Sequence, residues 1–185
     1  MASGAAVVLT SRKIENVGPV AEGIQAAGSR ASALAAHAGD QAAAEAVVQA
    51  ALAEFGRVDI LVNNAATNPH FGPLLTAEAS HFDKIFEVNV KGYLYAIREY
   101  AARAAGGAIV NVASYAGINA APLMGPYGMS KAAVISMTRT LAVELAQVRI
   151  RVNAVAPGLV DTRFSAALLG DEEIRRRVLG DAPIP

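Results

Sequence analysis

The sequence predicts an α/β fold, a doubly wound parallel sheet with helices on both of its faces. Five short apolar segments alternate with helical segments of about 12 residues or more along the chain. The apolar segments are continuous, so the strands have no side for solvent, and this pattern is typical of a parallel sheet that is covered on both faces. With 185 residues, the chain has room for a single domain of this kind.

The five predicted strands are short β-branched or apolar runs that Gly, Pro, Asn and charged residues bound. The first strand opens directly after Gly4, and the Gly106-Gly107 pair precedes the fourth. The last strand ends at the turn Pro157-Gly158. These signals place the strands at 5–10, 30–37, 58–65, 108–114 and 149–156.

The helices between the strands follow from apolar periodicity and from residues that start or stop a helix. Asp40 stands at an N-cap, Gly28 and Gly56 stand at C-caps, and Pro126 fits the first turn of a helix. The helix after Asp40 has one apolar face, made of Val47, Val48, Ala51, Leu52 and Phe55. The predicted helices are 14–27, 41–55, 79–104 and 126–147, with a further amphipathic helix after Thr162.

Composition excludes several classes of function. Sixteen basic and sixteen acidic side chains cancel, so the chain has no positive field to attract nucleic acid or an anionic membrane. The absence of cysteine excludes disulfides, thiolate catalysis and cysteine-ligated metals, and His70 and His81 lack the spacing of a metal pair. The amino-terminal residues lack the pattern of a signal peptide, and no window approaches about 18 unbroken apolar residues. We expect a cytoplasmic protein with no metal site and no nucleic-acid or membrane partner.

Polar residues follow several of the predicted strands, at the edge of the sheet where ligands gather. Asn64 lies at the end of the third strand, Ser114 ends the fourth, and the segment from Pro157 to Thr162 follows the fifth. Between them lie Tyr127 and Lys131, whose i, i+4 spacing puts the phenol and the ammonium on one face of a helix. This collection of groups indicates a site at the carboxyl ends of the strands.

Together these residues resemble the short-chain dehydrogenase/reductase family, nicotinamide-dependent oxidoreductases on a Rossmann-type sheet. The matching motifs are NNAA at 63–66 for the family's NNAG, NVKG with Asn89, VNVASYAG with Ser114, YxxxK with Tyr127 and Lys131, and PGLVDT at 157–162. Their order and spacing agree with the family, with Ser114 thirteen residues before Tyr127. The resemblance runs from about Gly4 to about Pro185, nearly the whole chain.

The chemistry of the catalytic residues can also be argued from their side chains. Hydride transfer to a carbonyl creates an alkoxide, which needs a proton donor, and Tyr127 can donate. Lowering the pKa of a phenol from about 10 to near 7 takes about 4 kcal/mol, which an ammonium about 4 Å away, that of Lys131, would supply. The resemblance implies that Ser114 hydrogen-bonds the substrate oxygen and that Asn89 holds a water linking Lys131 to solvent.

The cofactor implied by the resemblance is NADP rather than NAD. The family binds the adenosine ribose after its second strand, where an aspartate favours NAD, but this chain has Thr10-Ser11-Arg12-Lys13 and no acid before Glu15. The hydroxyl of Ser11 and the cation of Arg12 suit a 2′-phosphate. The other cofactor-binding residues implied by the resemblance are Ala38 through its backbone, Asn64, Tyr127, Lys131, Pro157, Gly158, Val160 and Thr162.

The sequence departs from the family at three kinds of place. His37-Ala38 stands where the family often has an aspartate near the adenine, and Ala66 replaces the last glycine of NNAG. The first strand, the glycine-rich turn and the helix that receives the pyrophosphate are missing before Gly4, and the last helix and strand are missing after Pro185. Residues 1–185 therefore predict one partial dinucleotide-binding domain whose sheet lacks its first and last strands.

Two functions remain open at this point. One is an NADP-dependent oxidoreductase that reduces a carbonyl or oxidises a secondary alcohol, with carbonyl and 3-oxoacyl reductases as the nearest substrate classes by resemblance. The other is a non-catalytic remnant that cannot bind cofactor and docks on full-length relatives. In either case the helices 79–104 and 126–147, which pair subunits in many family members, predict a homo-oligomer.

Overall fold

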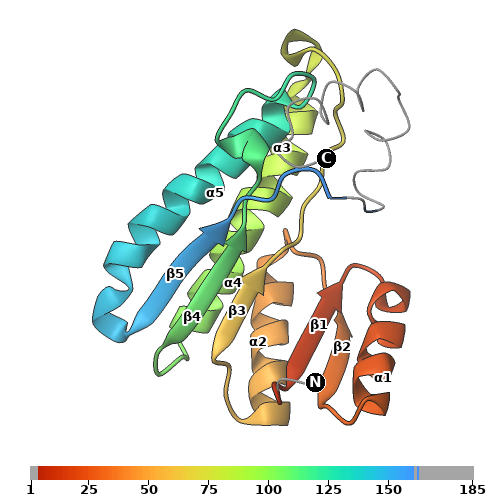
Figure 1. Cartoon of the computed structure of the whole chain (residues 1–185), viewed down its shortest axis with the longest axis vertical. Helices are drawn as coiled ribbons and strands as arrows, with labels where there is room; N and C mark the ends of the chain where they lie inside the picture. Colours follow the sequence, from red (N-terminus) through yellow and green to blue (C-terminus); the bar gives the residue numbers. More distant parts are fainter. Residues whose placement is uncertain (1–3, 161, 163–185) are drawn as a thin grey trace.

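The computed structural model describes residues 4–160 and 162, and within them all five predicted strands are present (Figure 1). The strands are β1 (Val7–Ser11), β2 (Ala31–Ala35), β3 (Ile60–Asn63), β4 (Gly107–Val112) and β5 (Ile150–Val155). The α-helices are α1 (Gly18–Ala26), α2 (Gln41–Phe55), α3 (Ala79–Phe86), α4 (Gly92–Ala101) and α5 (Gly125–Glu144). The helix predicted after Thr162 lies outside the described residues.

All strand pairs are parallel, which confirms the predicted α/β class. β1 pairs with β2 from Val7↔Ala31 onward, β3 pairs with β4 from Ile60↔Ala108, and β4 pairs with β5 from Gly107↔Ile150. Within the described residues, however, these strands form a two-stranded part, β1-β2, and a three-stranded part, β3-β4-β5, with no hydrogen-bonded ladder between them. The sheet is therefore incomplete, and β1 and β3 each have one edge that pairs with no described strand.

Helices α4 and α5 cover one face of the three-stranded part, and the main hydrophobic core lies between them and the strands. Its buried members are Ile97, Tyr100, Ile109, Ile150 and Val152. Burying one such side chain contributes about 1.5–3 kcal/mol. On β3, the alternate residues Ile60 and Val62 are 62% and 57% exposed, so no described element covers that face of the strand. Among the described residues, this face of β3 is therefore left uncovered.

The ends of α2 are those that the sequence predicts. Asp40 adopts an extended backbone, and its Oδ1 accepts hydrogen bonds from the backbone N–H groups of Ala42 and Ala43, at 2.8 and 3.4 Å. Gly56 closes the helix with φ 78°, a left-handed conformation that glycine adopts without strain. Both predicted caps of this helix are confirmed.

The predicted helix 126–147 ends slightly earlier, at Glu144, before a 3₁₀ turn, Ala146–Val148, and two other predicted helices differ more. The segment 14–27 begins as a 3₁₀ turn, Ile14–Asn16, and becomes α-helical only at Gly18, because Pro19 has no N–H donor and suits a first helical turn. The segment 79–104 is interrupted by a π-helical turn, Glu87–Lys91, between α3 and α4. The π turn contains Asn89, whose side chain bonds outside the helix, as described below. No helix among the described residues is long and apolar enough to span a membrane.

Gly117 lets the loop after β4 lie against α5. It ends a 3₁₀ turn, Tyr115–Gly117, and a Cβ built on it would lie 2.7 Å from the carbonyl carbon of Lys131 and 2.8 Å from the nitrogen of Ala132. Distances under about 3 Å to backbone atoms cannot be relieved by rotating a side chain. This contact fixes the loop that begins at Ser114 against the helix that contains Lys131.

We predict that Gly117→Ala lowers the free energy of unfolding by about 1–3 kcal/mol, because the added methyl separates the loop from α5. The matched control is Gly23→Ala in α1, where a Cβ would meet nothing within 4 Å. That substitution raises the free energy of unfolding by about 0.5–1 kcal/mol, since alanine loses less backbone entropy than glycine on folding. Urea unfolding of the two variants measures both effects, and changes of equal sign would contradict the packing argument.

Candidate active site

Tyr127 and Lys131 lie near the beginning of α5 and face the sheet. Pro126 occupies the first turn of this helix, where its missing N–H costs nothing, so the helix begins just before Tyr127. Both side chains are buried, and Lys131 is only 1% exposed. The i, i+4 spacing therefore does what the sequence predicts, bringing a phenol and an ammonium to one buried face of the helix.

The ammonium of Lys131 is held by groups from β4 and α4. Nζ donates to the backbone carbonyl of Val112 at 2.7 Å and to the hydroxyl of Tyr93 at 3.4 Å. It also lies 5.3 Å from the ring centre of Tyr93 and 5.7 Å from that of Tyr127, within range of cation–π attraction. Among the described residues no carboxylate forms an ion pair with it. Burial lowers the pKa of Lys131 to about 8.

The pKa of Tyr127 differs in direction from the sequence prediction. Burial raises the pKa of this phenol, and a hydrogen bond with the side chain of Ser114 lowers it by less. The prediction assumed that an ammonium about 4 Å away would dominate. In the structure the loss of hydration dominates, because the Lys131 ammonium is bonded toward Val112 and Tyr93. The phenol is therefore protonated at neutral pH and can act as a donor.

Ser114 lies two residues after the end of β4 and joins Tyr127 and Lys131 at the site. Its Oγ accepts a hydrogen bond from the backbone N–H of Ala116 at 3.2 Å, so the residue caps the following 3₁₀ turn. The same side chain forms the hydrogen bond with Tyr127. Ser114 can cap the turn and serve the site at the same time, because the bond from Ala116 N–H holds its Oγ in place beside the Tyr127 phenol.

Asn89 is completely buried and connects three segments. Its Oδ1 accepts from the backbone N–H of Thr67 at 2.8 Å, and its Nδ2 donates to the backbone carbonyl of Thr67 and to Oγ of Ser130, both at 3.1 Å. Ser130 in turn donates to the carbonyl of Tyr127 at 2.7 Å. Both N–H donors of the amide are in use within the protein, and the role of Asn89 in holding a water stays a prediction.

Sequence reasoning missed a second buried chain of polar groups. Asn63 at the end of β3 donates to Asn111 on β4 at 2.9 Å, and Asn111 donates to Thr138 on α5 at 3.0 Å. Asn111 is part of the VNVASYAG motif, but an asparagine inside an apolar strand gave no signal of its partners. Tyr93 was missed as well, although its position four residues after Asn89 puts the two on one helical face.

The residues predicted to bind the cofactor lie at the carboxyl ends of the strands, apart from Tyr127 and Lys131 on α5. Ser11 ends β1 and accepts a hydrogen bond from Asn16, Arg12 is exposed directly after it, and Asn64 is exposed after β3. After β5, the carbonyl of Pro157 accepts from the backbone N–H of Tyr115 at 2.9 Å, and exposed Gly158, Val160 and Thr162 follow. Asp161 lies outside the described residues.

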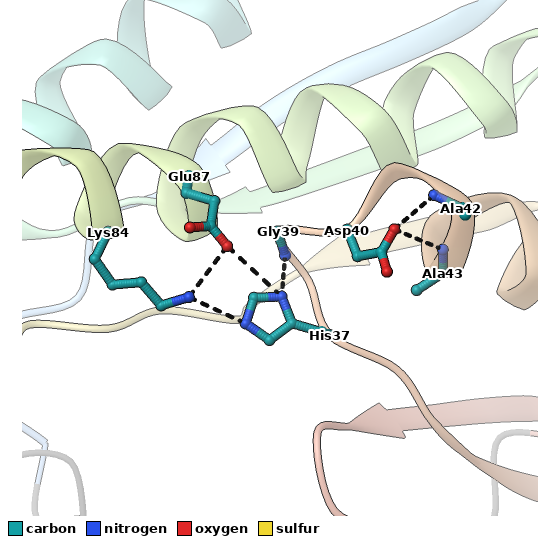
Figure 2. A network of polar contacts seen from close by, with 7 residues as sticks. All are labelled: His37, Gly39, Asp40, Ala42, Ala43, Lys84 and Glu87. Atoms are coloured by element: carbon teal, nitrogen blue, oxygen red, sulfur yellow. Dashed lines mark hydrogen bonds and ion pairs between the residues drawn. The ribbon is translucent and has the colours of Figure 1, made fainter.

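Ala38 and His37 form the loop after β2. Ala38 lies close to α4, because a Cβ on Gly92 would lie 2.4 Å from its carbonyl oxygen. Nδ1 of His37 accepts from the backbone N–H of Gly39 at 3.1 Å, and its Nε2 lies 3.3 Å from Nζ of Lys84, which also binds Glu87 at 3.1 Å (Figure 2). His37 therefore bonds within its own loop and to Lys84 of α3.

The groups at the carboxyl ends of the strands suit the ribose hydroxyls and the 2′-phosphate of a dinucleotide, but not its pyrophosphate. Two of the three ammonium donors of Lys131 have partners in the described part of the chain, which leaves one for a ribose hydroxyl. Arg12 and Lys13 are exposed cations that suit a phosphate on the adenosine ribose. A glycine-rich turn leading into a helix, which would receive the pyrophosphate, is not found between residues 4 and 160.

Comparison with known proteins agrees with the predicted fold and family. Residues 1–185 match a family model described as Enoyl-(Acyl carrier protein) reductase. Dehydrogenase/reductase SDR family member 4 from Oryctolagus cuniculus is 40% identical over 179 residues, which cover 95% of this chain and 69% of that protein. A short chain dehydrogenase from Burkholderia cenocepacia J2315 in complex with NADP is 35% identical with a TM-score of 0.82, over 87% of this chain and 66% of that one. NAD+-bound xylitol dehydrogenase is 27% identical with a TM-score of 0.87, over 97% and 75%.

The chain belongs to the short-chain dehydrogenase/reductase family, which confirms the resemblance found in its motifs. It spans about two thirds of the length of the curated relatives, 69% for the rabbit protein and 65% for that of Mus musculus. The relatives named above are dehydrogenases or reductases, so the family is one of oxidoreductases.

We predict that the free energy of unfolding rises by about 2 kcal/mol between about pH 7.5 and pH 9.5. The pKa of Lys131 is about 8 when folded and 10.5 as an ordinary lysine, so between these values the unfolded chain binds more protons, and raising the pH favours the folded state. Tyr93 and Tyr127, whose pKa values burial raises, act in the opposite direction only above about pH 10.

Urea unfolding across this pH range measures the effect, and Lys131→Met is the control because it removes the titrating group. In that variant the rise disappears. At pH 7 the variant is more stable than the wild type by up to about 3 kcal/mol, since a buried charge has been replaced by a neutral side chain. A wild-type stability that is flat or falls from pH 7.5 to 9.5 would show that the ammonium is not buried as described.

Proposed function

We propose that this chain carries the catalytic groups of an NADP-dependent oxidoreductase that reduces a carbonyl or oxidises a secondary alcohol. The observation that carries the proposal is the group of half-buried Ser114 with buried Tyr127 and Lys131, in which the phenol is bonded to the serine and lies beside an ammonium. When a carbonyl is reduced, its oxygen gains negative charge and then a proton. A hydrogen-bond donor, an acid and a nearby cation are the groups that stabilise this oxygen and protonate it. Membership of a family of oxidoreductases supports the same reaction.

In the direction of reduction, a bound nicotinamide supplies the hydride. Ser114 hydrogen-bonds the substrate oxygen and holds it beside Tyr127. Tyr127 donates its proton to that oxygen, and the raised pKa of the phenol keeps the proton available at neutral pH. The phenolate that remains is stabilised by the Lys131 cation, which lies 5.7 Å from the centre of the Tyr127 ring on the same buried face of α5. In the direction of oxidation, the same groups act in reverse.

The preference for NADP over NAD rests on the segment after β1. Ser11, Arg12 and Lys13 offer a hydroxyl and two cations, and Glu15 is the first acid to follow. A guanidinium can bind a 2′-phosphate through two hydrogen bonds, whereas an acid at this place would repel it. Solved relatives include proteins with NADP and with NAD+, so the family alone leaves this choice open.

A second function is favoured by the division of the sheet. Since no described strand joins β1 to β3, the two parts of the sheet have unpaired edges, and the pyrophosphate lacks a helix N-terminus among the described residues. The alternative is a non-catalytic chain that docks on full-length relatives or on its own copies. Helices α4 and α5 suit such docking, because Leu94 and Val143 are exposed apolar residues on them.

Tyr127→Phe tests the catalytic proposal. We expect NADPH-dependent reduction of a panel of ketones and 3-oxoacyl thioesters by residues 1–185 to fall at least 100-fold in this variant, because its ring cannot donate a proton. Tyr100→Phe, a buried tyrosine away from Lys131, is the control and keeps its activity. Turnover above about a hundredth of the wild-type rate in Tyr127→Phe contradicts the general-acid role. Absence of turnover in the wild type, together with absence of NADPH binding, supports the docking alternative.

Arg12→Ala tests the cofactor preference. We expect the affinity for NADPH to fall by about 1.5–3 kcal/mol, the range of a hydrogen bond to a charged group, while the affinity for NADH changes little. Calorimetric titration of both cofactors measures this, with Arg30→Ala as a control for a change of charge elsewhere. Equal losses for NADPH and NADH would contradict the assignment of Arg12 to the 2′-phosphate.

A further inference from the structure

Tyr93 on α4 touches the catalytic lysine but has no part in the motifs that identified the site. It is 1% exposed, as buried as any tyrosine described here, and its ring packs with Ala113 and Val134 in a small core between α4, β4 and α5. A phenylalanine would fill this space equally well. The hydroxyl is therefore what needs an explanation.

The Tyr93 hydroxyl donates one hydrogen bond and accepts another. Tyr93 donates its one hydrogen to the carbonyl of Val112 at 3.1 Å, so toward Nζ of Lys131, 3.4 Å away, it can only accept. Lys131 donates to the same Val112 carbonyl at 2.7 Å. The three atoms form a closed triangle in which the ammonium has two acceptors on the side away from Tyr127.

Few groups around the Lys131 ammonium can stabilise its charge, so the Tyr93 hydroxyl matters as one of its acceptors. The titratable or charged groups that face Nζ are Tyr93 from α4 and Tyr127 from α5, and β4 contributes only the Val112 carbonyl. No carboxylate in the described part of the chain compensates the charge. A buried cation without a counter-ion depends on each hydrogen-bond acceptor it has.

We propose that Tyr93 is a positioning residue that fixes the ammonium of Lys131 and keeps it charged, and so controls its effect on Tyr127. The consequence for catalysis rests on the proposed function, but the contact with Lys131 does not. Burial raises the pKa of Tyr93, with a smaller contribution from Tyr127, so its hydroxyl remains an intact donor and acceptor throughout the range in which Lys131 titrates. Tyr93 takes no proton from the substrate and is not itself a catalytic residue.

The test compares two isosteric substitutions on the same helix. Tyr93→Phe removes only the hydroxyl in question. Tyr100→Phe is matched to it, because Tyr100 is also 1% exposed on α4 and its hydroxyl also donates to a backbone carbonyl, that of Asp59, at 2.8 Å. Tyr100 has no contact with Lys131 among those described. A purely structural effect of losing a buried hydroxyl therefore appears in both variants, and an effect on the ammonium appears only in the first.

The measurement is the pKa of Lys131 in the full 185-residue chain labelled with ¹³C-lysine. The chain has four lysines, Lys13, Lys84, Lys91 and Lys131, and Lys131→Arg assigns the signal. We expect the pKa of Lys131 to fall from about 8 to about 7 in Tyr93→Phe, the loss of about one hydrogen bond to a charged group, and to stay at about 8 in Tyr100→Phe.

An unchanged pKa in Tyr93→Phe overturns the proposal, and so does an equal fall in Tyr100→Phe. Loss of the folded state in Tyr93→Phe but not in Tyr100→Phe would assign the hydroxyl a structural role and also overturn it. The titration needs neither cofactor nor turnover, so its result is independent of the ketone assays. If the chain turns over, the pH profile of the Tyr93→Phe variant shifts by the same amount, while that of Tyr100→Phe keeps the wild-type profile.

Discussion

A buried lysine ammonium with no counter-ion among the described residues constrains the rest of the structure. Lys131 is held between β4, α4 and α5 by the Val112 carbonyl and the Tyr93 hydroxyl, and burial lowers its pKa to about 8. The cost of this burial works against folding, so the surrounding elements must be fixed by other means. A site that stabilises a negative charge during reaction gains from such a cation, because it is in place before the charge develops.

Buried polar chains between the same elements provide that fixation. Asn89 joins the loop after β3 to α5 through Thr67 and Ser130, and a second chain runs from Asn63 through Asn111 to Thr138. In both chains the amide is matched with a donor or acceptor, so little is lost by burying it. These chains and the close contact at Gly117 hold the start of α5 at the ends of β3 and β4. The positions of Tyr127 and Lys131 follow from this.

The sequence predicted the ends of a helix correctly where a single residue sets the local conformation. Asp40 and Gly56 define α2 at both ends, because a cap depends on a side chain and a backbone angle that are local properties. The π turn around Asn89 was not predictable, because the bonds that accompany it come from Thr67, 22 residues earlier in the chain. Likewise, no periodicity could predict that Ile60 and Val62 face no described element.

The class of fold and the family follow from the residues alone, and so does the choice of Ser114, Tyr127 and Lys131 as candidates for the site, since strand pattern and motif spacing are properties of the chain. The electrostatics of these groups depend on how the chain packs. The pKa of Tyr127 is raised rather than lowered, and Tyr93 joins the site, because both depend on which groups surround the Lys131 ammonium after α4 and α5 pack on β4. The spacing of residues along the chain does not show how well a side chain is hydrated or how far it lies from other charges. These two quantities set the pKa, and so the charge, of Tyr127 and Lys131.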